Sequence, residues 1–361
     1  MIKRDLVIIG GGPAGLSAAK IALDAKMKVT IVERFNQLGG QLIKQTHKFF
    51  GSELQYAKTR GFDIAKILID ELKDYDNLEI LLDANCVALY PDKVLTIYQA
   101  NKYMKYKAKS VIIASGASEK ILAFENNDLP GIYGAGAIQT LMNIYGIKPG
   151  KEVVMVGSGN IGLIVSYQLI QAGVKIKALL EAASQVGGYL VHAAKLKRLG
   201  VEILLNTTVK KAIGKEKLEK IVTVKLDENW QEIENSEKEM KTDALCISVG
   251  LSPLHQLMSM AGAKMLDVSE LGGLVPKKTC DYETTIPNVY ACGDVTGIEE
   301  ASSAMVEGRI AGLMAVKHLG FNLPDIEKIE EDLNNQLCVL RQGPCGEKIR
   351  CGLKKVGEIY D

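Results

Sequence analysis

The sequence begins with a glycine pattern that few folds can accommodate. An apolar run from Leu6 to Ile9 leads into Gly10-x-Gly12-x-x-Gly15, and residues at helical spacing follow. Such a run is typical of a buried parallel strand, after which the first glycine makes a tight turn. The second glycine lets the backbone approach a diphosphate, and the third lets helix and strand pack closely. The alternative is a glycine-rich turn that binds no ligand.

An acidic residue follows the next apolar segment, where a dinucleotide site requires one. Residues Lys28 to Val32 predict a second strand, and Glu33 comes directly after it, 18 positions beyond Gly15. A carboxylate at this spacing binds a ribose hydroxyl in dinucleotide-binding folds. The helix that begins after Gly12 would offer unpaired N–H groups and the positive end of its dipole to a diphosphate. The first segment therefore predicts a dinucleotide site.

The same arrangement recurs near the middle of the chain. An apolar strand leads into Gly157-x-Gly159-x-x-Gly162, and a helix and a strand that ends at Glu181 follow. Two such units in one chain predict two nucleotide sites, one in each of two domains. The alternative is that the second unit is a scaffold without a ligand. The chain is predicted to be of the α/β class, with two Rossmann-like dinucleotide-binding domains, the second inserted in the first, each with a parallel sheet and an antiparallel ribbon.

The order of the motifs suggests where the domains begin and end. We expect residues 1–118 and 251–323 to form the first domain and residues 119–250 to form the second. Residues 324–361 are expected to be a C-terminal tail.

Smaller elements are predicted from the same sequence patterns. Residues 94–108 are predicted to form two antiparallel strands, and a separate buried strand that ends in Ser-Gly is expected at 110–116. The charged stretch 209–241 is predicted to form a solvated antiparallel ribbon. Apolar spacing predicts a long helix over 301–319.

Composition limits the kinds of partner. The chain has 44 basic and 43 acidic residues and a formal net charge of +1, so nothing indicates a nucleic-acid or membrane partner. No apolar run approaches the roughly 20 residues that a membrane-spanning helix needs. Seven cysteines without a Cys-x-x-Cys motif indicate a reducing compartment. We therefore expect a cytoplasmic protein, and the sequence leaves open whether it forms an oligomer.

Together these motifs resemble those of the thioredoxin-reductase-like flavoproteins with two dinucleotide-binding domains, over residues 1–320. The resemblance implies FAD at the first fingerprint. It implies NAD(H) at the second, with another adenine nucleotide such as ATP as the alternative. An aspartate after a strand and a glycine, as at Asp294, is well placed for a polar ligand chain. The resemblance assigns Asp294 to the ribityl chain of the flavin and residues 39–42 to a loop beside the isoalloxazine.

In this numbering the resemblance implies two sets of cofactor-binding residues. The expected FAD contacts are Gly10, Gly12, Pro13, Ala14, Gly15, Glu33, Arg34, Gly40, Gln41, Leu42, Val87, Ala114, Ser115, Gly116, Gly293, Asp294, Ser302 and Ser303. The expected contacts of the second nucleotide are Gly157, Gly159, Asn160, Ile161, Gly162, Glu181 and Gly250. No catalytic side chain is predicted, because the cofactor carries the redox chemistry.

The chain departs from the reductases because it has neither a redox Cys-x-x-Cys nor an early cysteine pair. Dithiol chemistry is therefore excluded. The remaining pattern is most similar to the α-type subunits of sarcosine oxidase, opine oxidase, hydroxyproline dehydrogenase and hydrogen cyanide synthase, although their cysteine-rich iron–sulfur segment is missing. That resemblance implies electron transfer between NAD(H) and an acceptor, with a partner flavoprotein subunit or a small electron carrier. The alternatives are a stand-alone NADH:acceptor reductase and a nucleotide-loaded assembly subunit with little activity of its own.

The tail follows the point where the flavoprotein pattern is complete. Its first part predicts a polar helix with a narrow apolar stripe at Ile326, Ile329 and Leu333. Such a stripe must cover something, because exposed apolar surface is unfavourable. It covers either the first domain of the same chain or a partner subunit.

The end of the tail contains glycines and cysteines. Residues Gly343 to Gly346 predict a turn. Cys338, Cys345 and Cys351 are irregularly spaced and have no histidine near them in the sequence, whereas structural zinc takes four ligands. No metal site is expected.

Overall fold

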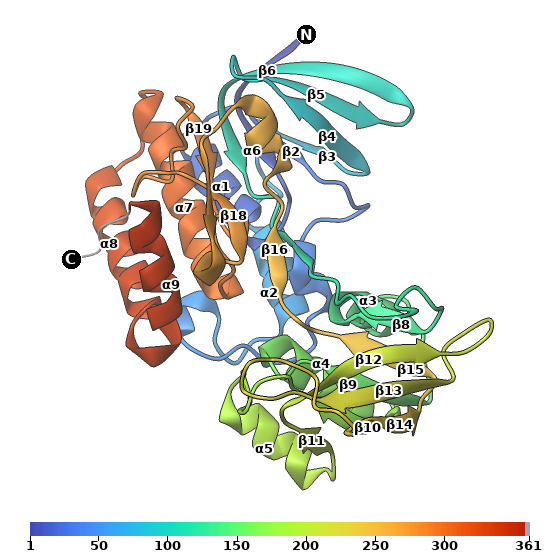
Figure 1. Cartoon of the computed structure of the whole chain (residues 1–361). Helices are drawn as coiled ribbons and strands as arrows, with labels where there is room; N and C mark the ends of the chain where they lie inside the picture. The colour runs from blue at the N-terminus through green and yellow to red at the C-terminus, as the bar shows by residue number, and fades with distance from the viewer. Residues whose placement is uncertain (358–361) are drawn as a thin grey trace. The chain divides into compact units, whose positions relative to one another are not determined.

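A computed structural model describes residues 1–357, apart from the side chains of residues 344 and 345, and it shows two compact units. The last four residues of the expected tail lie outside the described part. Unit 1 contains Met1–Ser118 and Ser252–Asp361, and unit 2 contains Glu119–Leu251. The chain leaves unit 1 through β7 (Ala117–Glu119) and returns through β16 (Leu251–Pro253), and these two strands pair (Figure 1).

Unit 1 is built on a seven-stranded sheet with the order β3-β2-β1-β6-β5-β4, in which β19 also pairs with β6. Strand β1 pairs in parallel with β2 on one side and with β6 on the other. Leu6 to Ile9 are all buried, because Leu6 and Ile8 lie in one hydrophobic core and Val7 and Ile9 in another. The strands of this sheet are β1 (Ile2–Ile9), β2 (Val29–Val32), β3 (Leu78–Leu81), β4 (Ala84–Leu89), β5 (Val94–Gln99), β6 (Lys102–Ile113) and β19 (Val289–Ala291).

Strand β6 differs from its prediction. We expected a strand ending at Ala108 and a separate one at 110–116, and this was wrong because one strand runs over Lys102–Ile113. Its first half pairs antiparallel with β5, and its last residues pair in parallel with β1 and β19. The backbone is continuous, but burial changes from alternating to complete along the strand. The hydrophobicity pattern of a strand depends on whether one or both of its faces are covered. Because this coverage changes along β6, the sequence suggested two separate strands.

Two helices of unit 1 pack at unusually short range. A Cβ atom on Gly308 would lie 2.1 Å from the Ala14 carbonyl oxygen, and one on Gly312 would lie 2.6 Å from that of Ala18. Glycine at both positions therefore lets α7 contact α1. The helices of unit 1 that lie outside the tail are α1 (Pro13–Asp24), α2 (Gly61–Asp70), α6 (Gln256–Ala261) and α7 (Ala301–His318), and β17 (Met265–Val268) with β18 (Gly273–Pro276) forms a small antiparallel pair.

The tail packs on unit 1, beside α7 in Figure 1. In α8 (Ile326–Leu340), Leu333 and Leu337 are buried in the core formed with α1 and α7. In α9 (Gly343–Val356), Leu353 and Val356 are buried against the segment around β17 and β18. The apolar stripe of α8 therefore packs on the first domain of the same chain, which is one of the two alternatives that the sequence left open.

The predicted turn at Gly343 to Gly346 was wrong. Helix α9 begins at Gly343, with a proline in its first turn. Proline is favoured at that place because the first N–H groups of a helix have no partner within it. The Gly-Pro sequence therefore marks the beginning of a helix here.

Unit 2 contains a parallel sheet with the order β11-β10-β9-β15-β8 and, as predicted, an antiparallel ribbon, β12-β13-β14. The parallel strands are β8 (Ile132–Gly134), β9 (Glu152–Val156), β10 (Lys175–Leu180), β11 (Glu202–Leu204) and β15 (Ala244–Ile247). The ribbon comprises β12 (Thr207–Ile213), β13 (Lys220–Lys225) and β14 (Lys238–Lys241), and the helices are α3 (Ala135–Asn143), α4 (Asn160–Gln171) and α5 (Leu190–Arg198).

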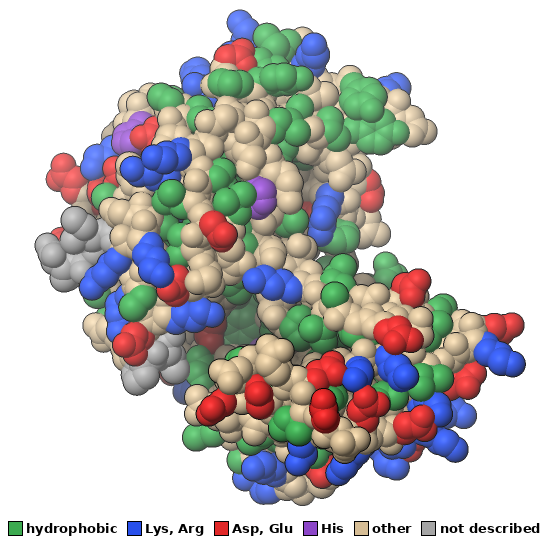
Figure 2. Space-filling model, viewed as in Figure 1, with side chains coloured by type: hydrophobic (Ala, Val, Ile, Leu, Met, Phe, Trp, Pro, Cys, Tyr) green, Lys and Arg blue, Asp and Glu red, His purple; other side chains and the backbone are tan. Residues whose placement is uncertain are grey.

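The predicted α/β class with two Rossmann-like domains is confirmed. Each unit has a parallel sheet and antiparallel strands, and the chain of unit 2 interrupts that of unit 1. Among residues 1–357 no helix has both the length and the apolar character that crossing a bilayer demands. On the face drawn in Figure 2, basic and acidic side chains are intermixed, in keeping with the near-zero net charge.

Candidate nucleotide-binding sites

The fingerprint of unit 1 joins β1 to α1, and its glycines have different reasons to be glycine. Gly10 has a φ of 107°, and a Cβ there would lie 2.3 Å from the Ala114 carbonyl oxygen. A Cβ on Gly15 would lie 1.9 Å from the Gly10 carbonyl oxygen. Gly12 is different, since its φ is −82° and its Cβ would meet no atom closer than the Gly40 Cα, at 3.8 Å. The fold therefore requires glycine at positions 10 and 15. At Gly12 the space beside the Cα is open to a ligand.

Glu33 directly follows β2, and backbone amides hold its carboxylate. Its Oε2 accepts a hydrogen bond of 2.7 Å from the Gly11 N–H, and its Oε1 accepts one of 2.9 Å from the Phe35 N–H. The side chain is 5% exposed. A carboxylate has about four lone-pair sites, so two remain for ribose hydroxyls.

A second glycine pair lies against the fingerprint. The Gly39 N–H donates to the Gly11 carbonyl oxygen at 2.8 Å, and a Cβ on Gly40 would lie 2.8 Å from the Gly12 Cα. Gly40 begins a short 3-10 helix over Gly40–Lys44, in which Leu42 is buried and Gln41 is exposed. The predicted loop of residues 39–42 therefore contacts the predicted diphosphate turn.

The ends of two further strands reach the same region. Ala114 and Ser115 follow β6, and the Ala114 carbonyl oxygen abuts Gly10. The Ser115 hydroxyl donates to the Leu254 carbonyl oxygen at 2.9 Å. Gly116 has a φ of 72°, and a Cβ there would meet nothing within 4 Å, which leaves open space beside the backbone.

Gly293 and Asp294 follow β19. A Cβ on Gly293 would lie 3.1 Å from the Ala14 Cβ, so this turn lies beside the first turn of α1. Burial raises the pKa of the Asp294 carboxyl to about 7, with further contributions from the Glu307 and Glu299 carboxylates. An acid with this pKa changes its charge near neutral pH.

The remaining residues expected at FAD are more varied in position. Ser302 and Ser303 are buried in the first turn of α7. Arg34 is exposed, with its guanidinium carbon 4.8 Å from the centre of the Phe35 ring. Val87 lies on β4 and is 42% exposed.

The arrangement in unit 1 fits a dinucleotide. Helix α1 begins at Pro13 with no side chain capping it, so its first amides are directed to the space beside Gly12. Amides and the helix dipole favour a diphosphate at that place, while Glu33 offers acceptors for a ribose. The structure thus brings together, around one turn, residues from four strand ends.

Unit 2 repeats this geometry. Gly157 has a φ of 98°, and a Cβ there would lie 2.1 Å from the Ser248 carbonyl oxygen. A Cβ on Gly162 would lie 2.2 Å from the Gly157 carbonyl oxygen, whereas a Cβ on Gly159 would meet nothing within 4 Å. Each of the three glycines corresponds to one in unit 1. Helix α4 also begins without a side-chain cap, and Gly250, which follows β15, has a φ of 115°.

Glu181 repeats the role of Glu33, with one added partner. Its Oε1 accepts a hydrogen bond of 2.9 Å from the Ala183 N–H, and its Oε2 accepts one of 2.9 Å from the Ser158 N–H. The Ser158 hydroxyl also donates to Oε2 and accepts a bond of 2.9 Å from the Gly187 N–H. Ser158 therefore links the acid to a second glycine pair and leaves fewer acceptors free than Glu33 has.

Ser158 and the loop at Gly187 were not predicted from the sequence, although a signal was present. The pattern Glu-x-x-x-Gln-x-Gly-Gly occurs at residues 33–40 and again at residues 181–188. The duplication therefore extends beyond the fingerprints. Of the other residues expected here, Asn160 accepts a bond of 2.8 Å from the Tyr189 N–H through Oδ1, and Ile161 is 40% exposed.

The cysteine side chains that lie within the sheets are poorly suited to thiol chemistry. Burial raises the pKa of the Cys86 thiol to about 12 and raises those of Cys246 and Cys292 well above the usual value of a thiol. Cys246 and Cys292 are completely buried and lie in different units. The side chain of Cys345, considered above as a metal ligand, lies outside the described part of the structure. Among the described residues, no group of three histidine, cysteine or acidic side chains could hold a metal ion.

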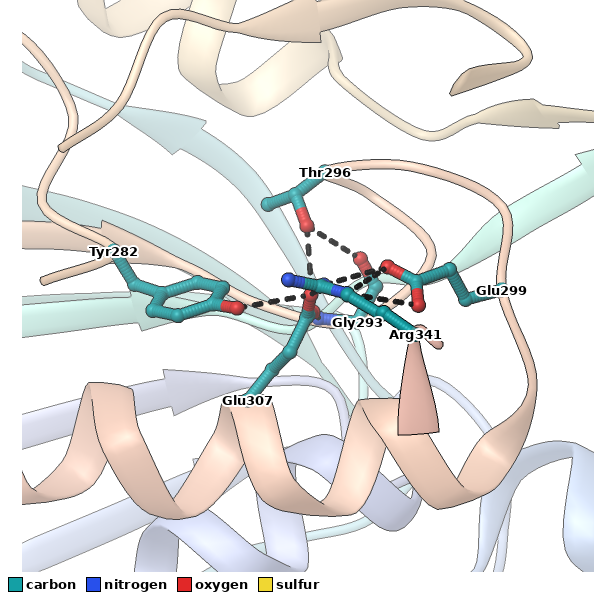
Figure 3. A network of polar contacts seen from close by, with 6 residues as sticks. All are labelled: Tyr282, Gly293, Thr296, Glu299, Glu307 and Arg341. Carbon is teal, nitrogen blue, oxygen red and sulfur yellow. Dashed lines mark hydrogen bonds and ion pairs between the residues drawn. The ribbon is translucent and has the colours of Figure 1, made fainter. Parts of the chain in front are cut away.

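A buried polar network beside Gly293 was also missed. It joins Tyr282, Glu299, Glu307 and Arg341, as Figure 3 shows. The sequence carries a signal for Glu307, which is the one charged residue between 301 and 308 in a helix of apolar and small residues. Nothing in the sequence links it to Arg341, which lies 34 residues later.

Two units, each with a fingerprint turn and an acid fixed beside it, define a protein with two dinucleotide-binding domains. The family described as pyridine nucleotide-disulphide oxidoreductase matches residues 4–308, and the chain belongs to it. It is therefore an FAD-dependent oxidoreductase, although its sequence has no Cys-x-x-Cys motif.

Individual relatives are distant. The hydrogen cyanide synthase subunit HcnB of Pseudomonas protegens is 25% identical over 333 residues, which cover 87% of this chain and 70% of that protein. The sarcosine oxidase subunit alpha of a Corynebacterium species is 24% identical over 89% of this chain but only 33% of its own length. The crystal structure of T. acidophilum thioredoxin reductase superimposes with a TM-score of 0.72 at 23% identity, covering 88% of this chain and 99% of that one.

Proposed function

We propose that the chain binds FAD in unit 1 and NAD(H) in unit 2 and passes a hydride or electrons between NAD(H) and an acceptor. The observation that carries this proposal is the repeated geometry, in which Glu33 and Glu181 are held by backbone amides beside uncapped helix starts. When bound, FAD supplies chemistry that accepts a hydride and can release its electrons separately. The protein's part is to bind and orient the nucleotides.

In unit 1 each residue has a physical role toward a dinucleotide. The first amides of α1 and the open face of Gly12 would hold the diphosphate, and Glu33 would accept from ribose hydroxyls. Asp294 would accept a hydrogen bond from the ribityl chain, and the buried start of α7 would bring amides to the flavin ring.

In unit 2 the residues favour a nucleotide without a 2′-phosphate. Glu181 stands where that phosphate would lie, and the residues after it, up to Gly188, are uncharged. Carboxylate and phosphate repel one another at this range, so NADH is preferred to NADPH. A different adenine nucleotide would satisfy Glu181 equally well and is the alternative ligand.

The relatives support the proposal that a partner protein exchanges electrons with the flavin. The relatives named above as subunits belong to larger enzymes, and this chain spans only part of their length. We propose that the chain works in the cytoplasm as the α-type subunit of an amine or amino-acid dehydrogenase, with a partner flavoprotein subunit or a small electron carrier. A stand-alone NADH:acceptor reductase is the second candidate, since the chain covers 99% of a thioredoxin reductase by itself.

Anaerobic titration with NADH tests the proposal. The purified chain is expected to be yellow, and its absorbance near the flavin band is expected to fall as NADH is added. A colourless protein that cannot be reconstituted with FAD would contradict the FAD assignment. A yellow protein that NADH does not bleach would instead favour a nucleotide-loaded assembly subunit.

A further inference from the structure

Glu307 is a buried carboxylate that reaches the predicted flavin turn from α7. It is 3% exposed. Its Oε2 accepts a hydrogen bond of 2.6 Å from the Gly293 N–H, and its Oε1 accepts one of 3.1 Å from the Tyr282 hydroxyl (Figure 3). The Thr296 hydroxyl donates to the Gly293 carbonyl oxygen at 2.9 Å. The peptide groups on both sides of Gly293 are therefore held, and Asp294 is the next residue.

The countercharge that contacts Glu307 directly comes from the tail, and Lys278 adds a second, weaker attraction. Arg341 follows the last residue of α8 and is 3% exposed. Its Nη2 contacts Glu307 Oε1 and lies 2.6 Å from Glu299 Oε1, and its Nε lies 3.1 Å from both oxygens of Glu299. The guanidinium thus joins two carboxylates that flank the start of α7, one before the helix and one within it.

Removing this guanidinium would leave Glu307 buried without its hydrogen-bonded countercharge, and Lys278 would be the remaining positive charge that acts on it. Breaking a buried ion pair from one side is strongly destabilising, because the remaining charge has lost its partner and stays out of water. A carboxylate responds by taking up a proton or by moving toward solvent. Either change weakens the bond to the Gly293 N–H, because a hydrogen bond to a charged acceptor is about twice as strong as one between neutral groups.

We propose that Arg341 is a positioning residue for the flavin, which acts through Glu307 to hold the Gly293–Asp294 turn in its binding conformation. The proposal rests on the FAD assignment made above. It gives the C-terminal tail a role in cofactor binding, although the family match ends at residue 308. Arg341 thus acts on the cofactor site from a place beyond the residues that the family match covers.

The variant Arg341→Met tests this, and Glu330→Gln is its matched control. Glu330 also lies on α8 and pairs with α7, through Lys317 Nζ at 2.8 Å, but on an exposed surface. We expect Arg341→Met to bind FAD about 10- to 100-fold more weakly than wild type, the range for losing a hydrogen bond to a charged group. Glu330→Gln is expected to bind FAD as wild type does. Arg341→Lys keeps the charge but not the planar fork, and an intermediate affinity is expected.

Hydrogen exchange of the apoprotein gives a reading that does not depend on FAD. Peptides that contain Gly293 to Thr296 are expected to exchange faster in Arg341→Met than in wild type and unchanged in Glu330→Gln. Unchanged exchange there would overturn the proposal, whatever the flavin does. If Arg341→Met does not fold, Arg341→Lys decides: wild-type exchange and FAD affinity in that variant overturn it. A wild-type protein that binds no FAD would refute the proposed function. The exchange measurement would still test whether Arg341 holds the Gly293–Asp294 turn.

Discussion

Replacing the middle glycine of each fingerprint by alanine should separate ligand binding from folding. At Gly12 and Gly159 the backbone is extended, with φ of −82° and −64°, which alanine adopts readily. A Cβ would meet its nearest atom at 3.8 Å on Gly12 and nothing within 4 Å on Gly159. Each new methyl group therefore enters only the space that we assign to a diphosphate.

The magnitudes can be estimated for both effects. In the apoprotein, replacing glycine by alanine at an allowed φ stabilises the folded state by about 0.4–1 kcal/mol, because it lowers the conformational entropy of the unfolded chain. Alanine is a poorer helix N-cap than glycine by about the same amount, so the two contributions nearly cancel. In the complex, a methyl group forced against a packed ligand costs about 1–3 kcal/mol. That corresponds to a dissociation constant raised roughly 5- to 150-fold.

Titration calorimetry and thermal unfolding of the apoproteins measure the two effects separately. Gly12→Ala is expected to weaken FAD and leave NAD(H) binding intact, and Gly159→Ala the reverse, with melting temperatures close to wild type. Gly15→Ala is the contrasting variant, because its Cβ would lie 1.9 Å from the Gly10 carbonyl oxygen and must disturb the fold itself. Wild-type affinity for every nucleotide in folded Gly159→Ala would refute the reasoning for unit 2 and leave its fingerprint a scaffold.

Three further predictions concern pH, nucleotide choice and thiols. Because the pKa of Asp294 in the apoprotein is about 7, above its ordinary value of 3.8, this group makes the apoprotein less stable as pH rises from about 4 to 7. FAD binding that needs the carboxylate should strengthen from pH 6 to pH 8, and a binding profile that is equally steep in Asp294→Asn would contradict this. NADH should reduce the flavin faster than NADPH because of Glu181, and equal rates would count against that role. Replacing Cys246, Cys280 and Cys292 by alanine should leave NADH-to-flavin transfer intact in the folded protein, so its loss would reveal a redox thiol that we have missed.

The sequence predicted those parts of the molecule that local spacing determines. Gly10, Gly15 and Glu33 could be assigned because a strand, a turn and a helix must follow one another within a few residues for the motif to form. The same holds for Gly157 and Glu181. The carboxylate–amide bonds seen at both acids are what this spacing implies.

Other features depend on which distant segments meet, and sequence spacing does not contain that information. Arg341 reaches Glu307 because α8 folds back on α7, and no local pattern predicts such a contact. The beginning of α9 was mistaken for a turn because Gly-Pro is common in both places. The length of β6 was underestimated because its two halves have different neighbours, and hydrophobicity follows the neighbours.

The insertion of unit 2 into unit 1 determines the order in which the chain can fold during its synthesis. Residues Met1–Ser118 leave the ribosome before unit 2, but β19 and α7, which complete their sheet and cover α1, come after the whole of unit 2. At about 5–20 residues per second, that delay is on the order of ten seconds. Unit 2 is continuous in sequence and can fold during this interval. The apolar face of α1 stays exposed until α7 has been synthesised. The synthesis of unit 1 therefore begins before that of unit 2, but unit 1 completes its fold later.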